Sequence, residues 1–275
     1  MNRKAHLLMM VAALSASPAL AYDYDHDYQW ETQLGFQPLA FPEDTPEDRN
    51  RGHFQAIYYP QPVRTCCHPL KELAFVNRAT AIHASYEYED DTFQEIYRLG
   101  ADYYYIPGMY GAAQVTHVRK FAQPELDEGN DTGFGIVLGL VPQSLPQLRL
   151  TAGVTWNSPD HFQRPVVAVT TKFFHQTEGG GALNLELVQE LVDNPLKSTI
   201  TDLSAELYYN RHISIGTGIN ISSNRQEENV SPRVSTELFL TRLISLSVEY
   251  RWEKSLDNNP SRVADSLSGQ ARVRF

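Results

Sequence analysis

The chain has 275 residues, of which 42% are hydrophobic and 20% charged, and its formal net charge is -10. The acidic excess argues against nucleic acid as a partner, because such proteins present a positive surface to the phosphates. The two cysteines, Cys66 and Cys67, are adjacent and therefore too close for an ordinary structural disulfide, so a bridge between them is not expected to hold the fold.

Residues 1–21 have the pattern of a Sec-type signal peptide. Asn2, Arg3 and Lys4 precede an apolar run over 7–16, and 19–21 fits a cleavage site, which predicts a cut after Ala21. The apolar run is too short for a membrane-anchoring helix. The expected mature protein is therefore an exported domain of residues 22–275.

No later apolar run approaches the length of roughly 18 residues that a membrane helix needs. An exported chain of this kind can span a membrane only as a closed β-barrel, because lipid offers no hydrogen-bond partners to an open sheet edge. An exported soluble domain is the alternative.

Strict alternation of apolar and polar residues is clearest over 198–221. One face of this stretch is apolar and uncharged, and it carries Leu203, Ala205, Leu207, Tyr209, Ile213, Ile215, Ile219 and Ile221. The other face carries polar residues such as Asp202 and Glu206. Two alternating runs joined by Asn210-Arg211 predict an antiparallel hairpin. Each arm is long enough to cross a bilayer as a tilted strand, with lipid on one side and water on the other.

Fourteen segments of this kind follow one another along the chain. They cover residues 27–36, 51–59, 78–88, 95–105, 111–121, 132–141, 147–156, 165–174, 182–190, 199–209, 211–221, 232–240, 242–252 and 265–275. Short connections alternate with longer polar ones, as in bacterial outer-membrane barrels, and an even number places both termini in the periplasm. The predicted fold is all-β: a transmembrane, antiparallel, up-and-down β-barrel of about 14 strands, with 12 or 16 as alternatives.

Two segments fit this scheme less well. Residues 60–77 are too long for a periplasmic turn, and the spacing of Leu70, Leu73 and Ala74 indicates a short helix after Pro69. We expect this periplasmic-side insert either to cap the mouth of the barrel or to fold inward. Residues 182–190 alternate, but they also fit a helix.

Charged residues fall on the face predicted to point into the barrel, because Arg or Lys facing lipid at mid-membrane costs about 2–4 kcal/mol. The predicted pore-lining residues are Glu31, Arg98, Asp102, Arg149, Lys172, Asp202, Glu206, Arg233, Glu237, Glu249, Arg251, Arg272 and Arg274. With both signs present, they would either set a transverse field in an open pore or pair and seal it. Aromatic residues gather at the segment ends, with Tyr28, Trp30 and Phe275 at the predicted periplasmic rim.

The run from His68 to Thr80, HPLKELAFVNRAT, resembles a G-P-L-x-E-A-A-F-L-x-R-A-S pattern found in a family of small general porins of Gram-negative bacteria. His68 and Leu73 depart from that pattern, and the likeness is sharp only over this run. The resemblance implies an outer-membrane barrel and passive diffusion. The terminal Phe275 also resembles the signal read by the barrel-assembly machinery.

The leading functional hypothesis is a non-enzymatic outer-membrane channel for passive diffusion of small hydrophilic solutes. Outer-membrane lipids and lipopolysaccharide would be its surroundings. The alternative is a non-conducting barrel with a structural or loop-mediated binding role. The nucleophile-elbow, P-loop and H-E-x-x-H motifs are missing from the sequence, and no catalytic residue, metal site or cofactor is predicted. The sequence leaves solute identity, lumen opening and oligomeric state undetermined.

Overall fold

The structure is a computed structural model, and it describes residues 27–38, 50–65, 68–89, 94–105, 108–121, 129–156, 165–178, 180–192, 198–224, 228–255 and 263–275. The predicted signal peptide and Cys66 and Cys67 lie outside the described residues. None of the helices in the described part of the chain is long and apolar enough to cross a membrane.

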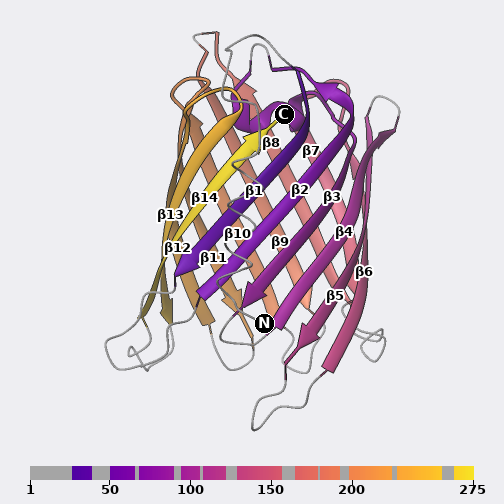
Figure 1. Ribbon diagram of the computed structural model, residues 1–275, viewed down its shortest axis with the longest axis vertical. Helices are drawn as coiled ribbons and strands as arrows, with labels where there is room; N and C mark the ends of the chain where they lie inside the picture. Colours follow the sequence, from indigo (N-terminus) through magenta and orange to yellow (C-terminus); the bar gives the residue numbers. More distant parts are fainter. Residues whose placement is uncertain are drawn as a thin grey trace.

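Fourteen strands form one closed antiparallel barrel in which each strand pairs with its neighbours in sequence (Figure 1). The strands are β1 (Tyr28–Pro38), β2 (Asn50–Val63), β3 (Ala81–Glu89), β4 (Gln94–Tyr105), β5 (Met109–Lys120), β6 (Gly129–Leu140), β7 (Leu148–Trp156), β8 (Val166–Gln176), β9 (Ala182–Val192), β10 (Ser198–Tyr208), β11 (Ile213–Ser223), β12 (Glu228–Phe239), β13 (Ile244–Ser255) and β14 (Val263–Arg274). The prediction of 14 strands is confirmed, and residues 182–190 form a strand and no helix.

The pairing of β1 with β14 closes the barrel. Its register runs from Glu31 opposite Arg274 to Phe36 opposite Gly269. The backbone N–H of Phe275 donates to the carbonyl of Trp30 at 2.9 Å, and the N–H of Trp30 donates back to Phe275 at 2.8 Å. The closure leaves no free edge between the first and last strands, which is what a barrel requires.

Side chains alternate between the outside and the lumen along each strand, as the sequence pattern predicts. Leu203, Ile215 and Leu246 point outward and are 49%, 59% and 47% exposed. Their neighbours Ser214 and Ser245 point inward and are buried. Because side chains of a regular strand alternate between its two faces, one outward apolar position determines which of the other residues in that strand point outward.

The two ends of the barrel differ. The turn end carries the connections 141–147, 209–212 and 240–243, and the C-terminus lies there (Figure 1). We call the opposite end the loop end.

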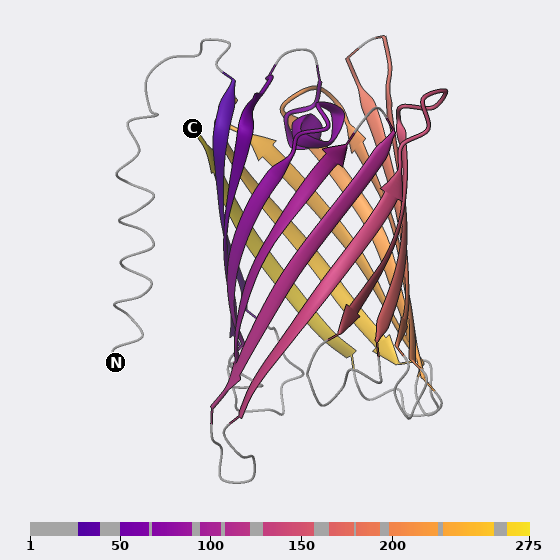
Figure 2. The same ribbon diagram turned by 90° about the vertical axis from the view of Figure 1, so that its right-hand side faces the viewer.

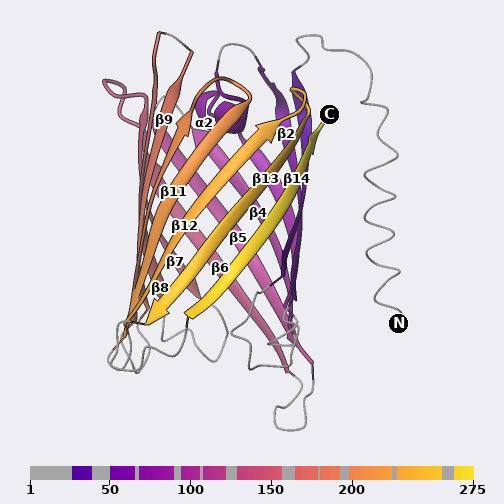
Figure 3. The same ribbon diagram turned by 90° about the vertical axis from the view of Figure 1, so that its left-hand side faces the viewer.

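A short helical segment connects β2 to β3 at the turn end. It comprises a 3-10 helix η1 (Leu70–Glu72) that runs directly into α2 (Leu73–Val76). Figures 2 and 3 both show this segment inside the ring of strands, not outside its mouth. Of the two predicted arrangements, the inward one is therefore correct. We call residues 68–80 the plug.

The predicted bounds of the insert, 60–77, are wrong at their start. Residues 60–63 belong to β2, and Val63 pairs with Tyr28. The register between β1 and β2 shifts between Tyr28 and Trp30, and β2 holds two prolines, Pro60 and Pro62, in the extra residues. A bulge accommodates residues that lack a backbone donor, so the strand continues past the prolines.

The prediction that Tyr28 joins an outward aromatic rim is also wrong. Its side chain is 1% exposed and stands edge-on to Tyr59, with ring centroids 5.5 Å apart. Trp30, two residues along the same strand, is 44% exposed as expected for an outward position. The irregular register between Tyr28 and Trp30 interrupts the alternation, and the ring of Tyr28 packs in one cluster with Leu70 and Leu73 of the plug.

Candidate functional site

The plug is held in the lumen by an apolar core. Leu70 and Leu73 have no exposed surface, and they pack in one cluster with Val63, Tyr59 and Phe239. Full burial of a leucine side chain stabilises by about 1.5–3 kcal/mol. One side of the plug is therefore anchored to the wall by a packed apolar cluster.

A second apolar contact holds the other side of the plug. Phe75 and Val76 pack against the buried side chains of Phe174, Ala182 and Tyr208 on the inner wall. The rings of Phe75 and Phe174 meet edge to face with centroids 6.5 Å apart. The two apolar clusters lie on different parts of the wall, so the plug bridges the lumen.

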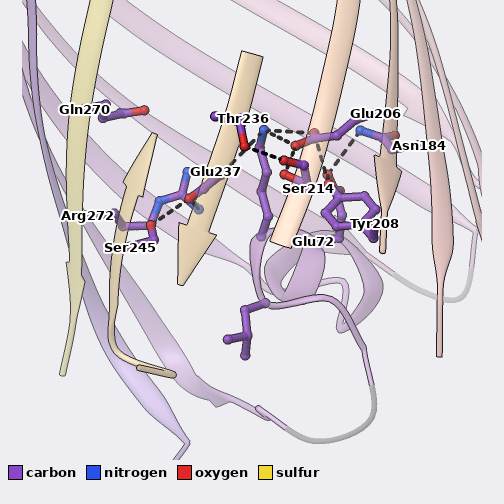
Figure 4. A network of polar contacts seen from close by, with 12 residues as sticks. Glu72, Asn184, Glu206, Tyr208, Ser214, Thr236, Glu237, Ser245, Gln270 and Arg272 are labelled. Carbon is purple, nitrogen blue, oxygen red and sulfur yellow. Dashed lines mark hydrogen bonds and ion pairs between the residues drawn. The ribbon is translucent and has the colours of Figure 1, made fainter. Parts of the chain in front are cut away.

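Glu72 is the most thoroughly bonded charge of the plug (Figure 4). Its side chain is 3% exposed, and its carboxylate lies 2.7 Å from the ammonium of Lys172. It also accepts hydrogen bonds from the hydroxyl of Tyr208 at 2.8 Å and from the amide of Asn184 at 3.1 Å. Burial raises the pKa of the Glu72 carboxyl, but Lys172 and the other donors lower it more, so the net pKa lies below its ordinary value of 4.5.

Lys71 carries the opposite charge and pairs with carboxylates of β10 and β12. Its ammonium lies 2.8 Å from the carboxylate of Glu206 and 3.6 Å from that of Glu237. Burial lowers the pKa of Lys71, but these two carboxylates raise it more, so the net pKa lies above its ordinary value of 10.5. Adjacent residues of opposite charge thus tie the plug to one continuous part of the wall, from β8 to β12, in which the hydroxyl of Tyr208 lies between Glu72 and Glu206.

The acceptors of Lys71 are themselves held by neighbouring strands (Figure 4). The hydroxyl of Ser214 donates to Glu206 at 2.5 Å, and that of Ser245 donates to Glu237 at 2.6 Å. Arg272 lies 3.3 Å from Glu237. Such supporting hydrogen bonds fix the positions of the two carboxylates that pair with Lys71.

Arg274 connects the closing strand pair to the plug. Its guanidinium lies 2.7 Å from Glu31 and also donates to the backbone carbonyl of Leu70 at 2.7 Å. It is sandwiched between the rings of Tyr28, at 4.7 Å, and Phe239, at 5.3 Å. A side chain that is 1% exposed and always charged is stabilised here by one carboxylate, one carbonyl and two aromatic faces.

The thirteen predicted residues fall into three groups. Glu31, Lys172, Glu206, Glu237, Arg272 and Arg274 contact the plug or its partners, Asp102 and Arg149 lie beside it, and Arg98, Asp202, Arg233, Glu249 and Arg251 form ion pairs with other wall residues.

In the third group the charges pair along the wall. Arg233 makes two bonds to Asp202, at 2.5 and 2.6 Å, and lies 3.8 Å from Glu249. Glu249 in turn lies 2.9 Å from Arg251. These partners sit on strands that are neighbours or next neighbours, so their ion pairs do not bridge the lumen. Among the described residues, Lys71 and Glu72 add ion pairs between the plug and the wall, with Glu206, Glu237 and Lys172.

Two cavities flank the plug. One, of about 260 Å³, lies between Phe75 and the wall residues Asp102, Tyr104, Tyr110 and Arg149. The other, of about 190 Å³, is polar. It is lined by Lys71, Glu206, Ser235, Glu237, Ser247, Glu249, Ser268, Gln270 and Arg272.

Sequence reasoning missed Lys71 and Glu72 as functional residues. The available signal was a lysine–glutamate pair placed between two leucines of helical spacing, in an insert that interrupts an otherwise regular series of strands. Their partners Lys172, Glu206 and Glu237 were among the predicted lining residues.

Two solved structures share this architecture at low sequence identity. Omp33, an outer membrane protein of Acinetobacter baumannii, matches with a TM-score of 0.69 and 17% identity over 92% of this chain and 100% of that chain. The CymD monoaromatic hydrocarbon channel matches with a TM-score of 0.58 and 9% identity over 91% of this chain and 89% of that one. No family model matches the chain, and no curated protein matches its sequence. The likeness therefore concerns the fold.

Proposed function

We propose that the protein is a Gram-negative outer-membrane channel for passive diffusion of small hydrophilic solutes, related to the small general porins. The observation that carries this proposal is the closed barrel whose exterior exposes many large apolar side chains and whose inner wall is charged. A closed barrel satisfies its backbone hydrogen bonds in lipid, and an inner wall of both charges suits a wet lumen. The turn end would face the periplasm, and Phe275 would serve the barrel-assembly machinery.

The plug would set the narrowest part of the path. Solutes entering from the loop end meet paired charges such as Asp202 and Arg233 before they reach the plug. The two cavities beside the plug are the spaces through which small solutes would pass. The field of the paired charges would favour polar solutes over apolar ones of equal size.

A second candidate is a barrel that does not conduct. The observation that favours it is the plug's own core, because Leu70 and Leu73 are completely buried in the lumen. In that case the plug would be a permanent stopper, and the barrel would serve as a structural element or as a support for binding loops.

Planar bilayer recordings distinguish the two. The refolded full chain is compared with Leu73→Ala, which loosens the plug, and with Leu203→Ala, the same change on the outer face. We expect stepwise conductance from the wild-type protein, larger or longer-lived steps from Leu73→Ala, and no change from Leu203→Ala. Silent bilayers with correctly folded wild-type protein would establish the non-conducting barrel.

A further inference from the structure

Arg149 differs from three other cations around the plug, Lys71, Lys172 and Arg274. Lys71, Lys172 and Arg274 each lie within 2.8 Å of a carboxylate oxygen. Arg149 has no described carboxylate within ion-pair distance. Its Nη1 donates to the hydroxyl of Tyr104 at 3.0 Å, and its Nε is buried without a hydrogen-bond partner among the described residues.

Aromatic rings lie against the guanidinium of Arg149 where the other three cations have a carboxylate. The guanidinium carbon of Arg149 lies 4.8 Å from the centroid of Tyr110 and 5.2 Å from that of Phe75 in the plug. Ring faces stabilise a guanidinium by cation–π attraction, but they satisfy none of its N–H donors. A charge that is always present and incompletely hydrogen-bonded away from bulk water favours the arrival of an anion.

The same arginine lines the larger cavity beside the plug. This cavity, of about 260 Å³, is bounded by Phe75, Tyr104, Tyr110 and Ile57 in addition to Arg149. Its walls are therefore largely aromatic and aliphatic, with the guanidinium as the positive group. A carboxylate accepts two N–H donors of one guanidinium, and the body of such a solute would pack against the rings.

Asp102 lies in the wall of the same cavity and restricts the charge of the occupant. It accepts a short hydrogen bond from the hydroxyl of Tyr110, the ring that also faces Arg149. Its second oxygen lies 3.6 Å from Nε2 of His83. A second negative charge on the solute would be repelled by this carboxylate, so a monoanion fits better than a dianion.

We propose that the larger cavity is a binding site for small monocarboxylates with an aromatic or aliphatic body, and that Arg149 receives the carboxylate. The inference deepens the proposed channel function, on which its role in transport rests, by naming the solute class of one of the two paths beside the plug. Tyr104 positions the guanidinium, and Phe75 ties the site to the plug.

The test is equilibrium binding to the refolded full chain in detergent, measured by isothermal titration calorimetry. The probes are benzoate, terephthalate and protonated benzylamine, which carry one negative, two negative and one positive charge on the same ring. We expect benzoate to bind more tightly than either of the others. Equal affinity for benzoate and benzylamine would overturn the proposal, because the ring alone would then account for binding.

Variants locate the site. Arg149→Gln is expected to weaken benzoate binding by about tenfold or more, since a charge-assisted bidentate pair is lost. Arg119→Gln is the matched control, because Arg119 is exposed on the outer face and also stacks on a ring, that of Phe121 at 4.9 Å. Unchanged benzoate affinity in a folded Arg149→Gln variant would refute the role of Arg149.

A further variant keeps the test decisive if Arg149→Gln does not refold. Tyr104→Phe removes the hydrogen-bond partner of Arg149 and leaves the charge, so benzoate should still bind more tightly than benzylamine. Loss of that preference in Tyr104→Phe would contradict an anion site at Arg149. Benzoate binding without bilayer conductance would support the binding site and refute the channel function. Conductance without benzoate binding would support the channel function and refute the binding site.

Discussion

Replacing Glu72 with glutamine tests what holds the plug in the lumen. Glutamine has nearly the same shape, and its carbonyl oxygen can still accept from Tyr208 and Asn184. The change removes the negative charge that lies 2.7 Å from Lys172, so a neutral amide then faces the ammonium. The apolar clusters around Leu70 and Phe75 stay intact, which isolates the ion pair.

The magnitude follows from the burial of the partner that remains. Removing one member of a buried ion pair costs about 3–5 kcal/mol, because the other charge is left without compensation. Lys172 is 13% exposed and keeps the ring of Phe75 at 4.8 Å, so the lower end of that range applies. We therefore expect the docked plug to lose about 3 kcal/mol, which raises the undocked population roughly a hundredfold.

Hydrogen exchange read by mass spectrometry on the detergent-refolded chain measures this population. The backbone N–H groups of Leu70, Asn77 and Ala79 donate to Arg211, Leu73 and Ala74 respectively. Exchange in the peptide covering 68–80 should accelerate roughly a hundredfold, while exchange in the strands stays unchanged.

Glu87→Gln is the matched control. Glu87 pairs with Arg98 at 2.8 Å and Arg51 at 3.8 Å, both on the wall and not in the plug, so its loss should leave exchange of 68–80 unchanged. The reasoning is refuted if Glu72→Gln leaves exchange of the plug at the wild-type rate. It is equally refuted if plug and strands accelerate together, because the ion pair would then stabilise the whole barrel and not the docking of the plug.

Four further predictions concern the plug and the outer face. Because docking lowers the pKa of Glu72, its ionised carboxylate stabilises the docked plug fully above pH 4.5, and this stabilisation is lost as the pH falls through the folded-state pKa. Acid should therefore undock the plug, as measured by hydrogen exchange corrected for intrinsic rates. The raised pKa of Lys71 gives the opposite pH dependence. Its ammonium stabilises the docked plug fully below pH 10.5, and this stabilisation is lost as the pH rises through the higher folded-state pKa. Leu73→Ala should weaken docking by about 2–5 kcal/mol, and plug exchange compared with Leu203→Ala checks this. Leu203→Arg should destabilise the barrel in lipid by about 2–4 kcal/mol in denaturant titrations, whereas Ser204→Arg on the inner face should cost far less.

The sequence alone determined the wall of the barrel. The alternation around Leu203 and Ile215 fixed which side chains face outward, since a strand places successive residues on opposite faces regardless of what surrounds it. It also identified Lys172, Glu206 and Glu237 as inward residues. These properties are local, so a pattern of neighbours in sequence carries them.

Only the tertiary structure decided what fills the barrel. The helical spacing of Leu70 and Leu73 was visible, but a cap and an inward plug have the same local pattern. The choice depends on contacts between distant segments, such as Glu72 with Lys172 and Leu70 with Phe239. Tyr28 packs against the plug, and Arg149 has no ion pair with a described carboxylate. Burial and charge pairing are set by what the closed barrel brings together and not by the order of residues along one strand.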